Sequence, residues 1–367
     1  MVSFGKIRVL VVDDSAIFRR FITTTLSADP GIEVVGAAAD PYEARDLILK
    51  LKPQVLTLDI EMPKMDGITF LKILSSQHPM PAVVFSSLSA RGSEYALQAL
   101  EAGAVDVMAK PSNGVLGNDL ARELISKVKA AAGANRFSKP AASTASPIAA
   151  SAPIAASGLS AYNSALNKAH PDQIILIGSS TGGTEALKEI LTALPPNLPP
   201  ICIVQHIPAG YSAALAKRLN ELSAMEVREA VNGDVPRRGT ALIAPGDMHM
   251  VLLKRDSGGY GVRLKHGPKV HQCRPSVDVL FESAAPLVGN KALAGILTGM
   301  GEDGARGLLA LRNAGARTFA QDEKSCVVYG MPRKAFEAGG VQKVVSLGDI
   351  APHIIKSVAG MASTVGL

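Results

Sequence analysis

The chain has 367 residues, of which 47% are hydrophobic and only 4% are aromatic, and tryptophan is absent. This length predicts two domains with separate cores, and the scarcity of aromatic side chains argues against a nucleic-acid surface built on stacked rings. The formal net charge of +6 arises mostly from residues 124–171, a stretch with five lysines and arginines and no acid. The charge therefore does not predict DNA binding.

The cysteines and the N-terminal region predict a cytoplasmic protein. Cys202 lies in an apolar run, and neither Cys273 nor Cys326 has a CxxC-type partner, so we expect no disulfide framework and no zinc site. The first apolar run, Ile7–Val12, is too short for a membrane span or a secretory signal and ends at Asp13.

In the first half of the chain, short apolar runs alternate with helical patterns. Five runs predict β-strands: Ile7–Val12, Ile32–Ala37, Val55–Leu58, Ala82–Phe85 and Val105–Met108. Five β/α units predict a doubly wound five-stranded parallel sheet in residues 6–130. In such a sheet the chemistry lies at the carboxyl ends of the strands.

Three carboxylates are expected at that edge. Asp13 and Asp14 follow the first strand, and Asp59 follows the third. Crowded carboxylates need a cation, and oxygen ligands suit a hard ion such as Mg²⁺. Each aspartate by itself is also a common helix cap, but that explanation does not account for their convergence.

A lysine and two hydroxyl groups complete a predicted phosphoryl-transfer site. Lys110 follows the fifth strand, and Ser86 and Ser87 follow the fourth. The segments VLVVDDS, LTLDIEMPKMDGI and AGAVDVMAKP resemble two-component response-regulator receiver domains, which have the flavodoxin-like fold of this prediction.

The resemblance implies that a histidine kinase or a small phosphodonor phosphorylates Asp59. It also implies that Asp13, Asp14, Asp59 and the Glu61 carbonyl hold Mg²⁺, with Lys110 on the phosphoryl oxygens. Ser86 and Ser87 both remain candidates for the switch hydroxyl, with Ser87 preferred from its spacing.

Residues 131–170 are rich in alanine, serine and proline and contain the segment PAASTASPIAASAPIAASG. This composition cannot build a core and predicts a flexible linker.

The strand–loop–helix pattern returns after this linker. Apolar runs at Ile174–Ile177, Ile201–Val204 and Leu293–Leu297 predict parallel strands. Between them, two alternating runs flank Asp256–Gly259, which predicts an antiparallel hairpin. For residues 171–362 we therefore expect a Rossmann-like α/β domain with a mainly parallel sheet.

Ser180 lies in the tight turn GSSTG, between a predicted strand and a predicted helix. Small residues in such a turn expose the hydroxyl near amides that open the helix, so a nucleophile and an oxyanion site can coincide there. The same pattern also binds phosphate or simply makes a turn.

A serine nucleophile needs a base and an orienting acid. His206 follows a strand at the same expected edge, and Asp303 lies in GMGEDG after another strand. Asp303 can also be explained as a helix cap. Weaker candidates for the acid are Glu302, Asp247 and Asp278.

The segments LIGSSTGGTEAL, VQHIPAGYS, APGDMHM, RPSVDVLF and LTGMGEDGA resemble the chemotaxis protein-glutamate methylesterase family. The resemblance implies a catalytic triad of Ser180, His206 and Asp303, without a cofactor in this domain. It further implies that Thr181, a backbone amide near Met300 and Arg274 shape the oxyanion and substrate sites. Cys273 departs from the polar residue expected there and receives no role.

The implied function is a phosphorylation-activated hydrolase that removes methyl groups from glutamate γ-methyl esters of chemoreceptors and releases methanol. Members of the family also deamidate receptor glutamines through the same acyl-enzyme. The implied partners are methyl-accepting chemoreceptors and a chemotaxis histidine kinase, without nucleic acid and without membrane insertion. The alternatives are a catalytically inactive receptor adaptor and a DNA-binding response regulator, although the second half lacks a helix-turn-helix pattern.

Overall fold

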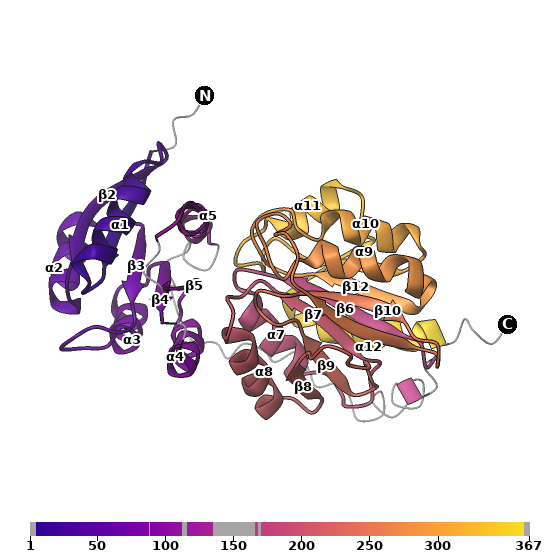
Figure 1. Cartoon of the computed structure of the whole chain (residues 1–367). Helices are drawn as coiled ribbons and strands as arrows, with labels where there is room; N and C mark the ends of the chain where they lie inside the picture. The colour runs from indigo at the N-terminus through magenta and orange to yellow at the C-terminus, as the bar shows by residue number, and fades with distance from the viewer. Residues whose placement is uncertain (1–4, 88, 112–115, 135–165, 168–169, 363–367) are drawn as a thin grey trace, which may run out of the picture. The chain divides into compact units, whose positions relative to one another are not determined.

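The structure is a computed structural model that describes residues 5–87, 89–111, 116–134, 166–167 and 170–362. The chain folds into two compact units, residues 1–139 and residues 140–367 (Figure 1). Most of the predicted linker, residues 131–170, lies outside the described residues.

The first unit is built on a five-stranded parallel sheet in the order β2-β1-β3-β4-β5. Its strands are β1 (Ile7–Val12), β2 (Ile32–Ala38), β3 (Val55–Asp59), β4 (Ala82–Ser86) and β5 (Asp106–Ala109). Its helices are α1 (Ala16–Ser27), α2 (Pro41–Leu51), α3 (Gly67–Gln77), α4 (Ala90–Glu101) and α5 (Asn118–Ala132). The predicted doubly wound sheet is confirmed.

Local sequence explains where the helices of this unit begin. Ser15, Asp40 and Asp66 each accept a hydrogen bond from a backbone amide in the first turn of the helix that follows. Helix α1 contacts α5, whereas α3 contacts α4, as expected when helices cover both faces of a parallel sheet. The carboxyl ends of β1, β3 and β5 therefore meet at one edge.

The second unit contains a seven-stranded sheet in the order β14-β13-β12-β6-β7-β9-β8, and every neighbouring pair is parallel. Its strands are β6 (Ile174–Ser179), β7 (Ile201–Gln205), β8 (Glu226–Glu229), β9 (Thr240–Ile243), β12 (Ala292–Ile296), β13 (Arg317–Gln321) and β14 (Lys343–Val345). Its helices are α7 (Gly183–Thr192), α8 (Tyr211–Leu222), α9 (Val277–Val288), the short 3₁₀ helix η2 (Gly289–Lys291), α10 (Ala305–Asn313), α11 (Met331–Glu337) and α12 (Leu347–Ala362).

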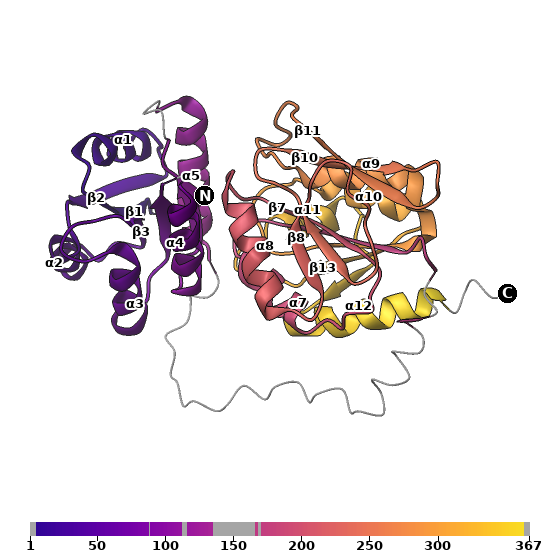
Figure 2. The ribbon, with the colours of Figure 1, turned by 60° about the horizontal axis from the view of Figure 1, so that its bottom comes forward.

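Helices cover both faces of this sheet (Figures 1 and 2). Helices α9, α10 and α11 lie on one face, whereas α7, α8 and α12 lie on the other, and α10 contacts both α9 and α11. The predicted hairpin is confirmed as a separate two-stranded antiparallel sheet of β10 (His249–Lys254) and β11 (Tyr260–Lys265), and β10 packs on α9.

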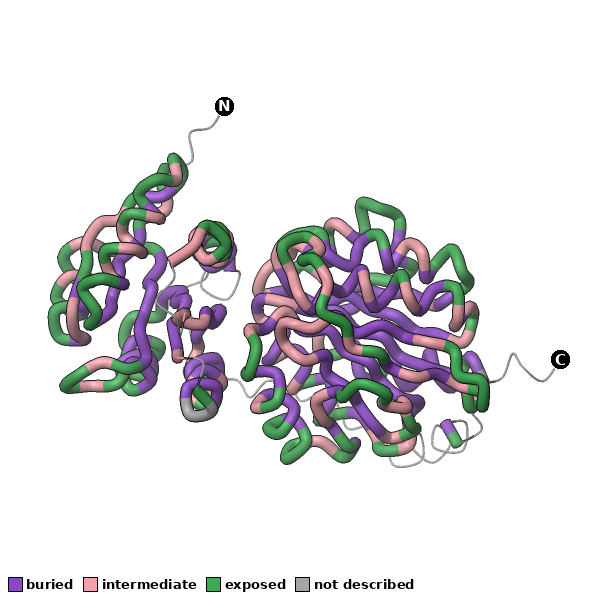
Figure 3. Tube along the Cα trace, viewed as in Figure 1, coloured by how far each residue is buried: buried purple, intermediate pink, exposed green. Residues whose placement is uncertain are grey.

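The central strands are buried along their whole length (Figure 3). Close packing of α9 on β6 depends on Gly178, since a Cβ at that position would lie 2.3 Å from a methyl carbon of Val277. Helix α9 is thus pressed against the sheet with its first turn near the carboxyl ends of the strands. No helix in the described part of the chain combines the length and apolar character of a membrane span.

Candidate functional site

The structure joins His206 to Asp303 at the carboxyl edge of the seven-stranded sheet. His206 directly follows β7, and Asp303 lies in the loop between β12 and α10. His206 Nε2 lies 2.7 Å from Asp303 Oδ2. Asp303 is buried, and only 12% of the His206 side chain is exposed, so this contact is shielded from water.

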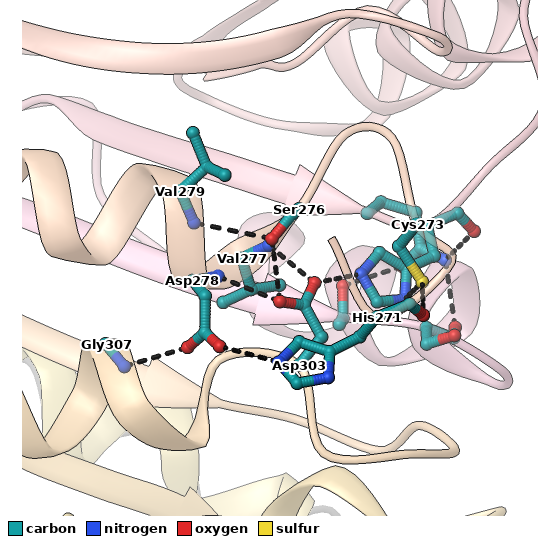
Figure 4. A network of polar contacts seen from close by, with 12 residues as sticks. His271, Cys273, Ser276, Val277, Asp278, Val279, Asp303 and Gly307 are labelled. Atoms are coloured by element: carbon teal, nitrogen blue, oxygen red, sulfur yellow. Dashed lines mark hydrogen bonds and ion pairs between the residues drawn. The ribbon is translucent and has the colours of Figure 1, made fainter. Parts of the chain in front are cut away.

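The first turn of α9 holds the Asp303 carboxylate (Figure 4). Ser276 Oγ and the Asp278 amide donate to Oδ1 over 2.7 and 3.0 Å, and the Val277 amide donates to Oδ2 over 2.7 Å. Burial by itself raises the pKa of a carboxyl, but the His206 contact and these hydrogen bonds hold the pKa of Asp303 below its ordinary value. The positive end of the helix dipole acts in the same direction. The carboxylate is therefore fixed and ionised.

Ser180 lies in the turn between β6 and α7. Its amide donates to Thr298 O over 3.0 Å, and its carbonyl accepts from Gln205 Nε2 over 2.9 Å. The turn is closed by Gly182, whose φ of +77° favours glycine. The backbone of Gly299 passes so near that an added Cβ would lie 2.7 Å from Ser180 Cβ. Ser180 is thus held firmly by its backbone.

Ser180 and His206 leave neighbouring strands. Ser179 pairs with Gln205 across β6 and β7, and the His206 amide donates to Ser179 O over 3.0 Å. Among the described residues no hydrogen bond joins the Ser180 hydroxyl to His206. The structure therefore brings two members of the predicted triad into contact and sets the third on the adjacent strand end.

The other ring nitrogen of His206 faces a thiol. Cys273 Sγ lies 3.5 Å from His206 Nδ1. Burial lowers the pKa of a histidine, but Cys273 and Asp303 together raise the pKa of His206 to about 10. The ring therefore holds its proton strongly in this arrangement, and only its unprotonated form can act as a base.

The three predicted pocket residues differ in their surroundings. Thr181 is buried and its carbonyl accepts from Thr298 Oγ1 over 3.0 Å, so its backbone is tied to the loop after β12. Met300 follows Gly299 in that same loop and is half-buried. Arg274 donates to Asp247 Oδ1 and to Gly267 O over 2.6 Å each, which fixes its guanidinium in the loop that also holds Cys273.

The weaker candidates for the acid have other partners. Asp278 is fully buried and binds His271 Nε2 at 3.2 Å and the Gly307 amide at 2.8 Å. Glu302 faces the other nitrogen of His271 at 3.3 Å. Asp247 pairs with the guanidinium of Arg274. Of the four candidate acids, Asp303 is therefore the one that contacts His206.

The first unit gathers its predicted acidic cluster. Asp13, Asp14 and Asp59 place one carboxylate oxygen each within 4.8 Å of the others, at the ends of β1 and β3. Lys110 Nζ lies 2.6 Å from Asp59 Oδ2 and 2.9 Å from Asp13 Oδ2. Burial raises the pKa of Asp59 to about 7, against the lowering effect of Lys110. Apart from this ion pair, the buried Asp13 Oδ2 accepts no hydrogen bond within the described residues, and a hard cation would satisfy it.

The two candidate hydroxyl groups, on the last residue of β4 and on the residue after it, have different surroundings. Ser86 is buried and donates to Gly92 O over 2.8 Å. Ser87 is half-buried and donates to Glu61 Oε1 over 2.8 Å, and the Glu61 amide in turn donates to Asp59 Oδ1 over 3.2 Å. Ser87 is therefore the hydroxyl that connects to the acidic cluster.

The sequence analysis missed two residues that support the site around Ser180 and His206 in the second unit. Ser276 caps α9 by accepting from the Val279 amide while it donates to Asp303. Gln205 accepts from Ser179 Oγ over 2.6 Å and donates to the carbonyls of Ser180 and His206. The serine before the helical pattern of VDVLF was a usable capping signal for Ser276. No comparable signal marked Gln205.

Comparisons with known proteins agree for both units. A family model described as CheB methylesterase matches residues 175–354, and one described as response regulator receiver domain matches residues 9–117. Protein-glutamate methylesterase/protein-glutamine glutaminase 2 of Syntrophus aciditrophicus is 49% identical over 96% of this chain and 100% of its own length. The protein of that name from Hahella chejuensis is 47% identical over 98% of both chains. The crystal structure of the Thermotoga maritima CheB methylesterase catalytic domain superposes with a TM-score of 0.50 and 38% identity, over 51% of this chain and 99% of that one.

Proposed function

The chain belongs to the protein-glutamate methylesterase family, and we propose that it is a phosphorylation-controlled hydrolase of glutamate γ-methyl esters on chemoreceptors. The observation that supports this most is the His206–Asp303 contact, in which the first turn of α9 fixes Asp303 by hydrogen bonds. His206 follows β7, and Ser180 follows the neighbouring strand β6. Through the same chemistry we include hydrolysis of receptor glutamines, which the names of the relatives state for those proteins.

In the first half-reaction Ser180 Oγ attacks the ester carbonyl while His206 removes its proton. Because Asp303 binds Nε2, Nδ1 is the nitrogen that takes this proton. The ionised Asp303 orients the ring and stabilises the imidazolium. His206 then returns the proton to the departing methoxide, so that methanol leaves and a glutamyl ester remains on Ser180.

In the second half-reaction water hydrolyses this acyl-enzyme, with His206 again acting as the base. The oxyanion of each tetrahedral intermediate needs donors that are already in place. We assign that role to amides at the start of α7, beside Thr181, and of the loop at Met300. The close approach of Gly299 to Ser180 and the Thr298 contact to Thr181 support the assignment. Arg274, fixed by Asp247, shapes the substrate side.

For the first unit we propose that Asp59 accepts a phosphoryl group from a chemotaxis histidine kinase or a small phosphodonor. Asp13, Asp14, Asp59 and the Glu61 carbonyl would hold Mg²⁺, which would neutralise the negative charge that gathers at this site during phosphoryl transfer. Lys110 pairs with those oxygens in place of its present contact with Asp59.

The change that follows phosphorylation begins at a hydroxyl group. Ser87, which already contacts Glu61, is the proposed hydroxyl that turns toward the phosphoryl group. Ser86 instead secures the following helix through Gly92. Phosphorylation at this unit raises hydrolysis at the other, as expected for a switch that biases two states of the protein.

The proposed location is the cytoplasm, where chemoreceptor signalling segments are reached. The three cysteines are all free thiols, as expected in a reducing compartment.

The test is release of radioactive methanol from a chemoreceptor cytoplasmic fragment that bears labelled methyl esters. The full chain is assayed with and without acetyl phosphate, beside Asp59→Asn as the control. We expect release that rises with acetyl phosphate in the native chain and not in the control. An inactive adaptor would bind the receptor without releasing methanol, and a DNA-binding regulator would retain a DNA fragment instead.

A further inference from the structure

Cys273 contacts His206, the histidine proposed to take the proton of Ser180. Its Sγ lies 3.5 Å from His206 Nδ1, the ring nitrogen that Asp303 leaves free. Thiol, imidazole and carboxylate thus form a continuous relay of the kind that activates cysteine nucleophiles. His206, Cys273 and Asp303 place their donor atoms within 4.8 Å of one another.

The other two cysteines have different surroundings. Cys202 lies in β7 with 0% exposure, and Cys326 is 2% exposed. Burial raises the pKa of both thiols to about 12. Cys273 is instead half-buried, in the loop between β11 and α9, where its thiol can also donate to His271 O over 3.4 Å. Among three cysteines it therefore combines solvent access with a neighbouring base.

We propose that Cys273 is a modification site for hydroperoxides and compact alkylating agents, and that its modification stops ester hydrolysis. The group added to sulfur would occupy the space beside Nδ1, where Ser180 must deliver its proton. The inhibitory half of the proposal rests on the proposed function, whereas the reactivity of the thiol does not.

The oxidation balances without a further reagent. His206 takes the thiol proton, and the sulfur attacks one oxygen of the hydroperoxide. A sulfur–oxygen bond forms, the oxygen–oxygen bond breaks, and the alcohol or water leaves with the proton from His206. The sulfur is oxidised to a sulfenic acid and the peroxide is reduced. With iodoacetamide a carbon–sulfur bond forms and iodide leaves.

The experiment treats the full chain with iodoacetamide or hydrogen peroxide and follows each cysteine by peptide mass spectrometry, with methanol release measured in parallel. We expect Cys273 to be alkylated at least about tenfold faster than Cys202 or Cys326, because thiolate character and exposure set the rate. Methanol release is expected to fall in step with Cys273 modification. His206→Gln is expected to slow the alkylation of Cys273.

The matched variant is Cys273→Ser, compared with its own untreated rate. Neither reagent is expected to change that rate. Equal labelling of all three cysteines, unchanged labelling in His206→Gln, or full methanol release from protein modified at Cys273 would overturn the proposal. A native chain that releases no methanol before treatment refutes the proposed function, while the relative labelling rates still decide the reactivity of Cys273.

Discussion

Replacing Ser276 by alanine separates the stability of α9 from the chemistry at Asp303. Ser276 is fully buried, donates to Asp303 Oδ1 over 2.7 Å and caps the helix by accepting from the Val279 amide over 3.3 Å. A hydrogen bond to a charged group contributes about 1.5–3 kcal/mol and an N-cap about 1 kcal/mol. Since both belong to one side chain, we expect a loss of about 2.5–4 kcal/mol from the free energy of unfolding.

The expected effect on catalysis is much smaller. Asp303 keeps His206 and the amides of Val277 and Asp278 after this substitution, so it stays ionised and in place. We expect Ser276→Ala to retain about a tenth or more of the methanol release. Asp303→Asn should lower it by roughly 10³- to 10⁴-fold, because an amide at that position changes the tautomer of the histidine.

Stability is measured by urea denaturation followed by circular dichroism, because the chain has no tryptophan to report fluorescence. The control is Ser283→Ala in the same helix. Its hydroxyl donates a hydrogen bond to Leu280 O and accepts one from the Leu252 amide, but it does not contact Asp303. The reasoning is refuted if Ser276→Ala leaves stability unchanged, or if it lowers methanol release as far as Asp303→Asn does.

Three further predictions concern acid–base state, packing and the metal. Because the pKa of His206 is raised to about 10, its unprotonated form appears only as pH rises toward that value, so methanol release should increase with pH. Since Cys273 contributes to the raised pKa, Cys273→Ser should move the pH profile of methanol release to lower pH. Overlapping pH profiles of the variant and the native chain would contradict this. Gly299→Ala should lower methanol release at least about tenfold, since its Cβ would lie 2.7 Å from Ser180 Cβ, and native-like kinetics would argue against this close approach. Removing divalent cations with EDTA should abolish acetyl-phosphate labelling of Asp59 and leave unstimulated methanol release intact, as scintillation counting of both products can check.

The sequence predicted where the candidate site residues would lie because parallel strands end at a common edge. Ser180, His206 and Asp303 each follow an apolar strand, and in the first unit Asp13 follows β1 while Asp59 is the last residue of β3. Position after a strand therefore predicted their grouping without any knowledge of side-chain contacts.

The contacts around His206 and Asp303 could not be predicted from strand positions. Cys273 and Ser276 belong to the loop between β11 and α9, and only the packing of α9 on β6 brings that loop to His206. The nitrogen that Asp303 binds also depends on ring orientation, which no sequence pattern encodes. Polar or very short edge strands such as β8 and β14 gave no apolar run to detect.

The most direct test of the central claim is methanol release by Ser180→Ala in the full chain, with acetyl phosphate present and Asp59 phosphorylation measured in the same samples. Ser257→Ala, in the turn of the β10–β11 hairpin, is the matched control. We expect Ser180→Ala to lose roughly 10⁴-fold or more of the methanol release while Asp59 is phosphorylated as in the native chain. Methanol release by Ser180→Ala at the native rate would contradict the account.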